Sequence, residues 1–199
     1  MRIPNVSPGF DADWEKNGNA EKAVNLLAKW IESQKLNGCT LKILKEPKRT
    51  HMILAVIEAT AGVKDPKTVL FYAHCDKQPP LAEQWKPGLK PYDPVIQGSK
   101  MFGRGASDDG YGTYAIIMCI KACQMMGRPH DRCVVIIESC EESGSADLGY
   151  YLETIKDIVK IPSLMVIMDS GCGDYERLWL TTTLRGNLSI DLKRRLNRM

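Results

Sequence analysis

The sequence predicts an α/β fold, with a largely parallel sheet and helices on both of its faces. Two observations support this class. Short apolar runs alternate with longer segments of helical periodicity, so that the order along the chain is strand, helix, strand, helix, strand. The clearest runs, such as residues 68–73 and 133–137, are continuously apolar rather than alternating, which is typical of strands buried on both faces.

Each predicted element follows from its local pattern. Residues 19–34 place apolar side chains at helical spacing, and Asn37-Gly38 ends this helix with a turn. Two further helices are expected over residues 111–126 and 146–159. Strands are expected over residues 40–44, 52–57, 68–73, 133–137 and 164–168, with further strand over 178–183 and 188–192.

A long segment, residues 74–109, separates the strand over 68–73 from the second helix. It contains Pro79-Pro80, Pro87-Gly88, Pro91 and Pro94, which interrupt regular structure. Loops of this length within a compact domain are usually functional or disordered. This segment is therefore expected to contribute to a site.

The composition is that of an ordinary globular protein. The chain has 199 residues, of which 44% are hydrophobic and 26% charged, and its net charge of +3 is too small to indicate nucleic-acid binding. No apolar run approaches the roughly 20 residues that span a bilayer, and the N-terminus lacks the apolar core of a signal peptide. Seven cysteines without a CxxC pair favour free thiols, and we expect a cytoplasmic protein that binds neither membrane nor nucleic acid.

Acidic and imidazole side chains follow the predicted strands at the point where each strand ends. They are His74 and Asp76, then Glu141 and Glu142, then Asp169, while Asp108 ends the long segment just before a helix. In an open α/β sheet, ligand sites form beyond the carboxyl ends of the strands. The sequence therefore predicts that these side chains meet at one edge of the sheet.

Clustered carboxylates repel one another unless a cation neutralises them. A pair of divalent cations about 3.5–4 Å apart meets this need, and mixed His and carboxylate ligands suit zinc and also admit manganese. In the His74-Cys75-Asp76 motif, the aspartate can orient the imidazole of a metal-binding histidine. Of Glu141 and Glu142, one can bind metal while the other acts as general base.

Each motif has a structural explanation when it is taken alone. A lone histidine is usually structural, paired glutamates are often a solvated surface, and Asp169-Ser170-Gly171 can be a plain turn. A cysteine-based metal or redox site is a further alternative, because Cys75, Cys140 and Cys172 lie next to or near the motif residues. Neighbouring residues of an extended segment point to opposite sides, which turns the Cys75 and Cys140 thiols away from the site. The coincidence of all the motifs at strand and loop ends favours the carboxylate site.

The sequence resembles the metallopeptidase family of carnosine dipeptidase, glutamate carboxypeptidase and aminoacylase. The motifs that carry this resemblance are YAHCDKQP at 72–79, GRGASDDG at 103–110, ESCEESGS at 138–145 and MDSG at 168–171, with PGFDADWEKNG at 8–18 similar to dipeptidase-like members. The resemblance extends from about residue 5 to about residue 192. It implies a partial catalytic domain of the zinc exopeptidase type over residues 1–192, without the lid domain. Residues 193–199 include the basic side chains Lys193, Arg194, Arg195 and Arg198, and we expect them to form a solvated basic tail rather than a nucleic-acid patch.

The resemblance also implies a role for each site residue. His74 and Asp169 would bind one metal ion, Glu142 the second, and Asp108 both. Asp76 would orient His74, and Glu141 would be the general base. The implied reaction is hydrolysis of an amide bond in a dipeptide or N-acyl amino acid, with two zinc ions as cofactors and manganese as an alternative.

Two departures from the family pattern stand out. Gly110 follows the paired aspartates, where many relatives have lysine. Relatives also supply a downstream histidine to the second metal, after a lid domain, whereas the histidines here are His51, His74 and His130 only. We therefore expect an N-terminal portion of a longer enzyme, with an incomplete second metal site. An impaired remnant that acts as a metal-binding or interaction module, as a homodimer or with a full-length relative, is the alternative.

Overall fold

The computed structural model describes residues 1–190, 192 and 193. The chain divides into two compact units, Met1–Asp169 and Ser170–Met199. All the helices and strands of the described residues lie in the first unit. No described helix is both long and apolar enough to cross a membrane.

A five-stranded sheet with the order β1-β2-β6-β3-β7 forms the centre of the first unit. Its strands are β1 (Cys39–Leu44), β2 (Met52–Ile57), β3 (Thr68–His74), β6 (Arg132–Glu138) and β7 (Leu164–Ile167). β3 is parallel to both β6 and β7, whereas β2 is antiparallel to β1 and β6. The largely parallel sheet predicted from the sequence is confirmed, and β2 is reversed because a short connection joins it to β1.

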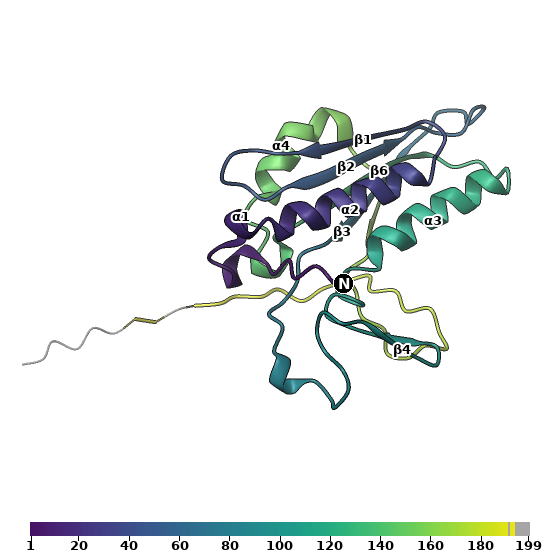
Figure 1. Ribbon diagram of the computed structural model, residues 1–199. Helices are drawn as coiled ribbons and strands as arrows, with labels where there is room; N and C mark the ends of the chain where they lie inside the picture. Colours follow the sequence, from purple (N-terminus) through teal and green to yellow (C-terminus); the bar gives the residue numbers. More distant parts are fainter. Residues whose placement is uncertain (191, 194–199) are drawn as a thin grey trace, which may run out of the picture. The chain divides into compact units, whose positions relative to one another are not determined.

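Helices cover both faces of this sheet, as predicted (Figure 1). On one face, α2 (Asn19–Ser33) and α3 (Gly112–Met125) pack against the odd-numbered residues of β2 and β6. On the other face, α4 (Leu148–Val159) packs against the even-numbered residues of the same strands. Successive strand residues point to opposite faces, so continuously apolar strands supply both cores.

The long segment between β3 and α3 contains structure that the sequence pattern did not predict. It includes the 3₁₀ turn η2 (Ala82–Gln84) and a hairpin of β4 (Val95–Gln97) and β5 (Lys100–Phe102). Near the N-terminus, the short elements η1 (Pro8–Phe10) and α1 (Trp14–Asn17) precede α2. A further turn, η3 (Glu141–Ser143), joins β6 to α4. Of these short elements, η3 follows the carboxyl end of β6, and η1 contacts η3.

The strands predicted over 178–183 and 188–192 are not formed in the described part of that region. Residues 178–190 have no regular structure, and Leu178, Leu180 and Leu188 are each more than three-quarters exposed. An apolar β-rich pattern cannot form a strand without a hydrogen-bonding partner, and the pattern does not specify that partner. Of the predicted basic tail, only residue 193 lies within the described residues, and the predicted domain boundary at residue 192 stays a prediction.

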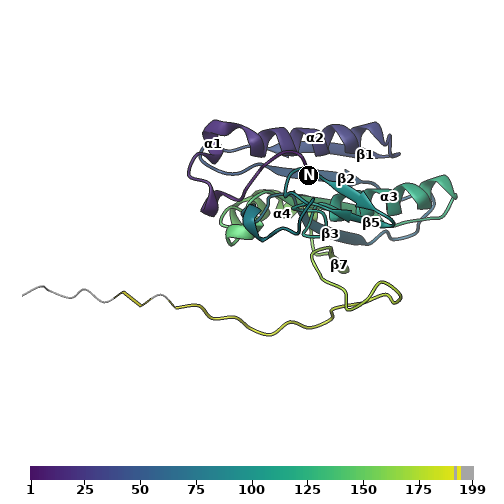
Figure 2. The same cartoon turned by 60° about the horizontal axis from the view of Figure 1, so that its bottom comes forward.

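β7 also differs from its sequence pattern, because it is an edge strand. Its residues Leu164, Met165 and Ile167 are each about half exposed, although the run LMVI is typical of a strand buried on both faces. Figure 2 shows β7 at the margin of the sheet. Its carboxyl end delivers Asp169 to the same edge of the sheet as His74.

Candidate metal centre

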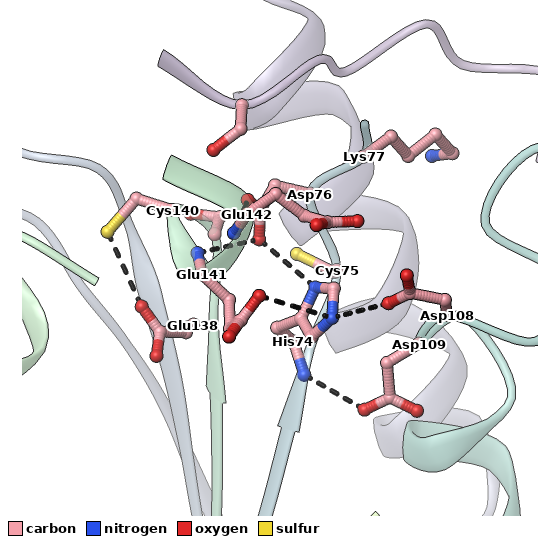
Figure 3. Close-up of polar contacts among 12 residues, drawn as sticks. His74, Cys75, Asp76, Lys77, Asp108, Asp109, Glu138, Cys140, Glu141 and Glu142 are labelled. Carbon is pink, nitrogen blue, oxygen red and sulfur yellow. Dashed lines mark hydrogen bonds and ion pairs between the residues drawn. The ribbon is translucent and has the colours of Figure 1, made fainter. Parts of the chain in front are cut away.

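His74 is the centre of the predicted site. It ends β3, and its side chain is 0% exposed. Figure 3 shows carboxylates on both sides of the imidazole. Nε2 lies 3.0 Å from Asp108 Oδ1, 3.7 Å from Asp169 Oδ2 and 3.9 Å from Glu141 Oε2. Three of the predicted residues therefore converge on one imidazole nitrogen.

Asp76 lies on the opposite side of the ring. Its Oδ1 is 3.3 Å from His74 Nδ1, and its side chain is only 2% exposed. The same carboxylate accepts the backbone N–H groups of Glu141 at 3.1 Å and Glu142 at 3.0 Å (Figure 3). Burial by itself raises the pKa of Asp76, but the His74 contact and these hydrogen bonds hold it below its usual value. Asp76 thus remains a charged acceptor that joins the end of β3 to the η3 turn.

Three of the predicted ligands are arranged to hold a divalent cation. One donor atom from each of His74, Asp108 and Asp169 lies within 4.8 Å of the other two. Asp108 is 60% exposed and Asp169 is 30% exposed, so a cation can reach them from solvent. Imidazole nitrogen and carboxylate oxygen are donors that suit zinc and manganese. The donor set therefore fits a metal ion of this type.

The electrostatics of the metal-free site agree with this fit. Burial raises the pKa values of Glu141, Glu142 and Asp169, and the negative charges of neighbouring carboxylates raise them further. Burial alone would lower the pKa of the His74 imidazole, but Asp76, Asp169 and Asp109 raise it to about 10. The clustered negative charge therefore favours binding of a positive charge, for which protons and a metal ion compete.

Glu142 lies apart from the three-ligand group. Its carboxylate Oε2 accepts a hydrogen bond of 2.5 Å from Gln78 Nε2. The charge of Asp108 contributes to its raised pKa, which shows that the two carboxylates are electrostatically coupled. Among the described residues, no further imidazole joins them, because His130 binds the Asp131 carbonyl and His51 lies near Glu21 and Lys45. The described residues thus offer one well-formed donor set and a second, sparser one.

Asp109 is a site residue that the sequence analysis passed over. Its side chain is fully buried, and Oδ2 accepts the backbone N–H of His74 at 3.1 Å (Figure 3). The peptide bond between Asp108 and Asp109 is cis. Burial, with a smaller contribution from Asp169, raises the pKa of Asp109 to about 7. The paired aspartates of the motif at 103–110 were the sequence signal for Asp109. Only the fold shows that Asp108 faces the acidic cluster, whereas Asp109 supports it from behind through the backbone of His74.

The N-terminal segment also contacts the site, through residues that the motifs did not single out. Asn5 Nδ2 donates to the Cys75 carbonyl at 2.7 Å, and the Ser7 N–H donates to the Lys77 carbonyl at 2.9 Å. The hydroxyl of Ser7 lies 2.7 Å from that of Ser143 in η3. This segment therefore connects the residues that follow His74 to the η3 turn that carries Glu141. Cys75 itself packs in the apolar core.

Comparison with known proteins identifies the class. A model of peptidase family M20/M25/M40 matches residues 70–179, which is more than half of the chain, and all four site motifs lie within or adjoin this range. The chain belongs to this family of metallopeptidases.

Individual relatives are similar over most of this chain but are much longer. An uncharacterized metallohydrolase of Methanocaldococcus jannaschii is 28% identical over 198 aligned positions, covering 94% of this chain and 48% of that protein. The structure of human carnosine dipeptidase 1 gives a TM-score of 0.67 at 23% identity, covering 85% of this chain and 36% of that one. The M20 metallo-carboxypeptidase Sso-CP2 of Sulfolobus solfataricus gives 0.68 at 24% identity, with coverages of 85% and 35%.

Human carnosine dipeptidase 1 and Sso-CP2 therefore share the fold of this chain. The chain spans about half the length of the archaeal relative and about a third of the length of each solved structure.

Proposed function

We propose that this chain carries the site of a metal-dependent hydrolase that cleaves the amide bond of a dipeptide or N-acyl amino acid. The observation that carries the proposal is the convergence of Asp108, Asp169 and Glu141 on Nε2 of the buried His74. Membership of the M20/M25/M40 family supports hydrolase chemistry. The carnosine dipeptidase and the metallo-carboxypeptidase that share this fold favour small peptide substrates for this chain.

In this proposal, His74, Asp108 and Asp169 hold one metal ion, and Asp108 with Glu142 contributes to a second. Zinc is the proposed ion, with manganese as an alternative. A divalent ion bound there would supply Lewis-acid activation of water and of the scissile carbonyl. Asp76 keeps the imidazole of His74 oriented and the η3 turn in place through its two backbone hydrogen bonds.

Glu141 is the proposed general base. Its side chain is one-third exposed, and Oε2 lies 3.9 Å from His74 Nε2, at the border of the donor set. Burial and the charges of Asp169 and Glu142 raise its pKa, which brings a carboxylate closer to the neutral range in which a base works best. Glu141 can therefore take a proton from water and return it to the leaving amine.

Glu141→Gln tests the proposed function. The wild-type chain, supplied with zinc or manganese, is expected to hydrolyse members of a panel of dipeptides and N-acetyl amino acids. Loss of the general base should lower kcat by about 100-fold or more, without loss of bound metal. Glu32→Gln, at an exposed position on α2, is the matched control and should keep full activity. Absence of turnover with either metal across the panel would refute the proposed reaction.

A metal-binding module without turnover is the second candidate function. The sparser donor set around Glu142 favours it, because the described residues supply only Asp108 and Glu142 for a second ion. We expect protein purified without chelator to hold about one metal ion tightly and a second weakly. Metal analysis after gel filtration measures this ratio, and two tightly held equivalents would contradict it.

A further inference from the structure

A cavity with mainly apolar walls borders the candidate metal centre on the side of α2 and α3. Its volume is about 450 Å³, within the roughly 300–1,000 Å³ typical of small-molecule sites. We call it the α2–α3 cavity. Its apolar walls include Ile3, Ala23, Leu26, Leu27, Met101 and Tyr114. His74 and Asp76 also line it, so it adjoins the metal centre through the end of β3.

One cationic side chain interrupts these apolar walls. Lys77 lies one residue beyond Asp76, lines the cavity and is only 6% exposed. Its ammonium group donates to the side-chain oxygen of Asn5, which also lines the cavity. A Cβ atom at Gly105 would come within 2.9 Å of Lys77 Cε, so the glycine leaves room for the lysine stem. The position of this lysine is therefore set by its surroundings.

The charge of Lys77 is not matched by a carboxylate. A lysine ammonium has three donors, and Asn5 offers one neutral acceptor. Within residues 1–190, 192 and 193, no carboxylate forms an ion pair with it. The charge of Asp76, the preceding residue, acts on Lys77, but the oxygens of Asp76 are occupied by His74 and by two backbone N–H groups. A buried cation without an anionic partner is unfavourable, and a ligand can supply that partner.

We propose that the α2–α3 cavity binds a monocarboxylate with an apolar chain. The carboxylate accepts hydrogen bonds from Lys77 Nζ, and the hydrocarbon chain packs against Ala23, Leu26 and Tyr114. Lys77 supplies the cationic side chain of this lining, and the α-ammonium of Met1, which also lines the cavity, adds positive charge near it. The remaining walls are mainly apolar, which favours a ligand that is charged at one end only. This site lies outside the proposed metal donor set and does not depend on hydrolysis.

Titration calorimetry with sodium octanoate tests the proposal on metal-free protein in the presence of EDTA. We expect saturable binding of one octanoate per chain. In a series from butanoate to octanoate, each added methylene should strengthen binding about fourfold, because it buries further apolar surface. Octanol has the same apolar chain without the charge, and should bind at least tenfold more weakly than octanoate. Equal affinity for octanol and octanoate, or no octanoate binding, would overturn the proposal.

Lys77→Met tests the head group, with Lys22→Met on the exposed surface of α2 as the matched control. The Lys77 variant should lose at least tenfold in octanoate affinity, and the control should lose none. Unchanged affinity in Lys77→Met would refute the assignment.

A second pair of variants keeps the proposal testable if Lys77→Met does not fold. Leu26 lines the cavity and is half exposed on α2, so Leu26→Asp should fold and repel the carboxylate. Met125→Asp is the control, because it introduces an aspartate at an exposed residue of α3 outside the cavity lining. We expect at least tenfold weaker octanoate binding in Leu26→Asp and unchanged binding in Met125→Asp. Octanoate binding that requires zinc and disappears in EDTA would place the carboxylate on the metal instead, and would refute the cavity site.

Discussion

Asp76 connects the strand that carries His74 to the turn that carries Glu141 and Glu142. It is almost fully buried and accepts two backbone hydrogen bonds besides its contact with the imidazole. A charged acceptor holds such N–H groups more strongly than a neutral one. The geometry of the proposed general base therefore depends on a residue that lies behind the metal ligand.

Asp76→Asn is expected to destabilise the chain by about 2–3 kcal/mol, because the amide offers one acceptor where the carboxylate offers two. Zinc affinity should fall about 10-fold to 100-fold, because the His74 ring loses its orienting charge. Urea unfolding and zinc titration measure the two effects. Asp157→Asn, on the exposed surface of α4, should change neither. A variant as stable as wild type would show that the two hydrogen bonds contribute little.

Lys77 provides a prediction about pH. Burial lowers its pKa from the usual 10.5, while Cys75 and Asp76 act in the opposite direction. Between the lowered pKa of the folded state and 10.5, the unfolded chain binds more protons than the folded chain. The free energy of unfolding should therefore rise with pH across this window.

Lys77→Met lacks this dependence. The stability of wild type minus that of Lys77→Met should increase as pH rises from the lowered pKa towards 10.5, and should be flat below the lowered pKa. Urea unfolding at several pH values measures the difference, and Lys22→Met should show no such trend because its lysine is exposed. A pH-independent difference for Lys77→Met would show that burial does not perturb this lysine.

At the scale of elements, Asp147 joins α4 to the connection between β1 and β2. It lies just before α4, and its carboxylate accepts hydrogen bonds from Thr50 N, Thr50 Oγ1 and Arg49 Nη1 at 2.7–2.9 Å. The Arg49 guanidinium also lies over the ring of Tyr150 in α4. This contact fixes the start of the helix that covers one face of the sheet.

Asp147→Ala is expected to destabilise the chain by about 2 kcal/mol. The substitution leaves the Thr50 N–H and hydroxyl without their acceptor, while the Arg49 contribution is small because that side chain is partly exposed. Thermal and urea unfolding measure the change. Asp147→Asn keeps one acceptor oxygen and should recover about half of the loss, whereas equal losses in both variants would point to a requirement for the charge itself.

At the scale of the whole molecule, the acidic cluster makes stability depend on metal. The pKa values of Glu141, Glu142 and Asp169 are raised in the metal-free chain. Between the ordinary pKa values of these groups and their raised values, the folded state therefore binds more protons than the unfolded state. These groups therefore lower the stability of the metal-free chain as pH rises from about 4 towards neutrality. A bound cation reverses this effect by neutralising the carboxylates.

Zinc at about 100 times its dissociation constant should stabilise the chain by about 2.7 kcal/mol, or roughly 5–10 °C in Tm. At one fixed zinc concentration, the shift should grow as pH rises from about 5 to about 7, because protons compete with the metal at lower pH and weaken its binding. Differential scanning calorimetry with zinc and with EDTA measures it. Asp108→Asn should abolish most of the shift, while Asp93→Asn, at an exposed loop position, should retain it. A zinc shift of equal size in Asp108→Asn would exclude Asp108 as a ligand.

The sequence by itself determined most of the helices and strands, and the edge of the sheet at which the candidate site residues lie. Continuous apolar runs and helical periodicity located five strands and three helices, and the polar residues after β3, β6 and β7 indicated one edge of the sheet. Both results depend on local patterns, namely which faces of an element are apolar and where the element ends. For the same reason, the sequence could name His74, Asp108 and Asp169 as one cluster.

Only the tertiary structure decided what depends on contacts between distant segments. Asp109 and Asn5 support the site through hydrogen bonds that span 35 and 70 residues, and Lys77 meets Asn5 across 72 residues at the wall of an apolar cavity. Only the tertiary structure likewise shows that residues 178–190, despite their strand-like pattern, pair with no other strand among the described residues. A local pattern records how a segment divides its polar and apolar side chains, but pairing, burial and cavities arise only when distant segments pack together.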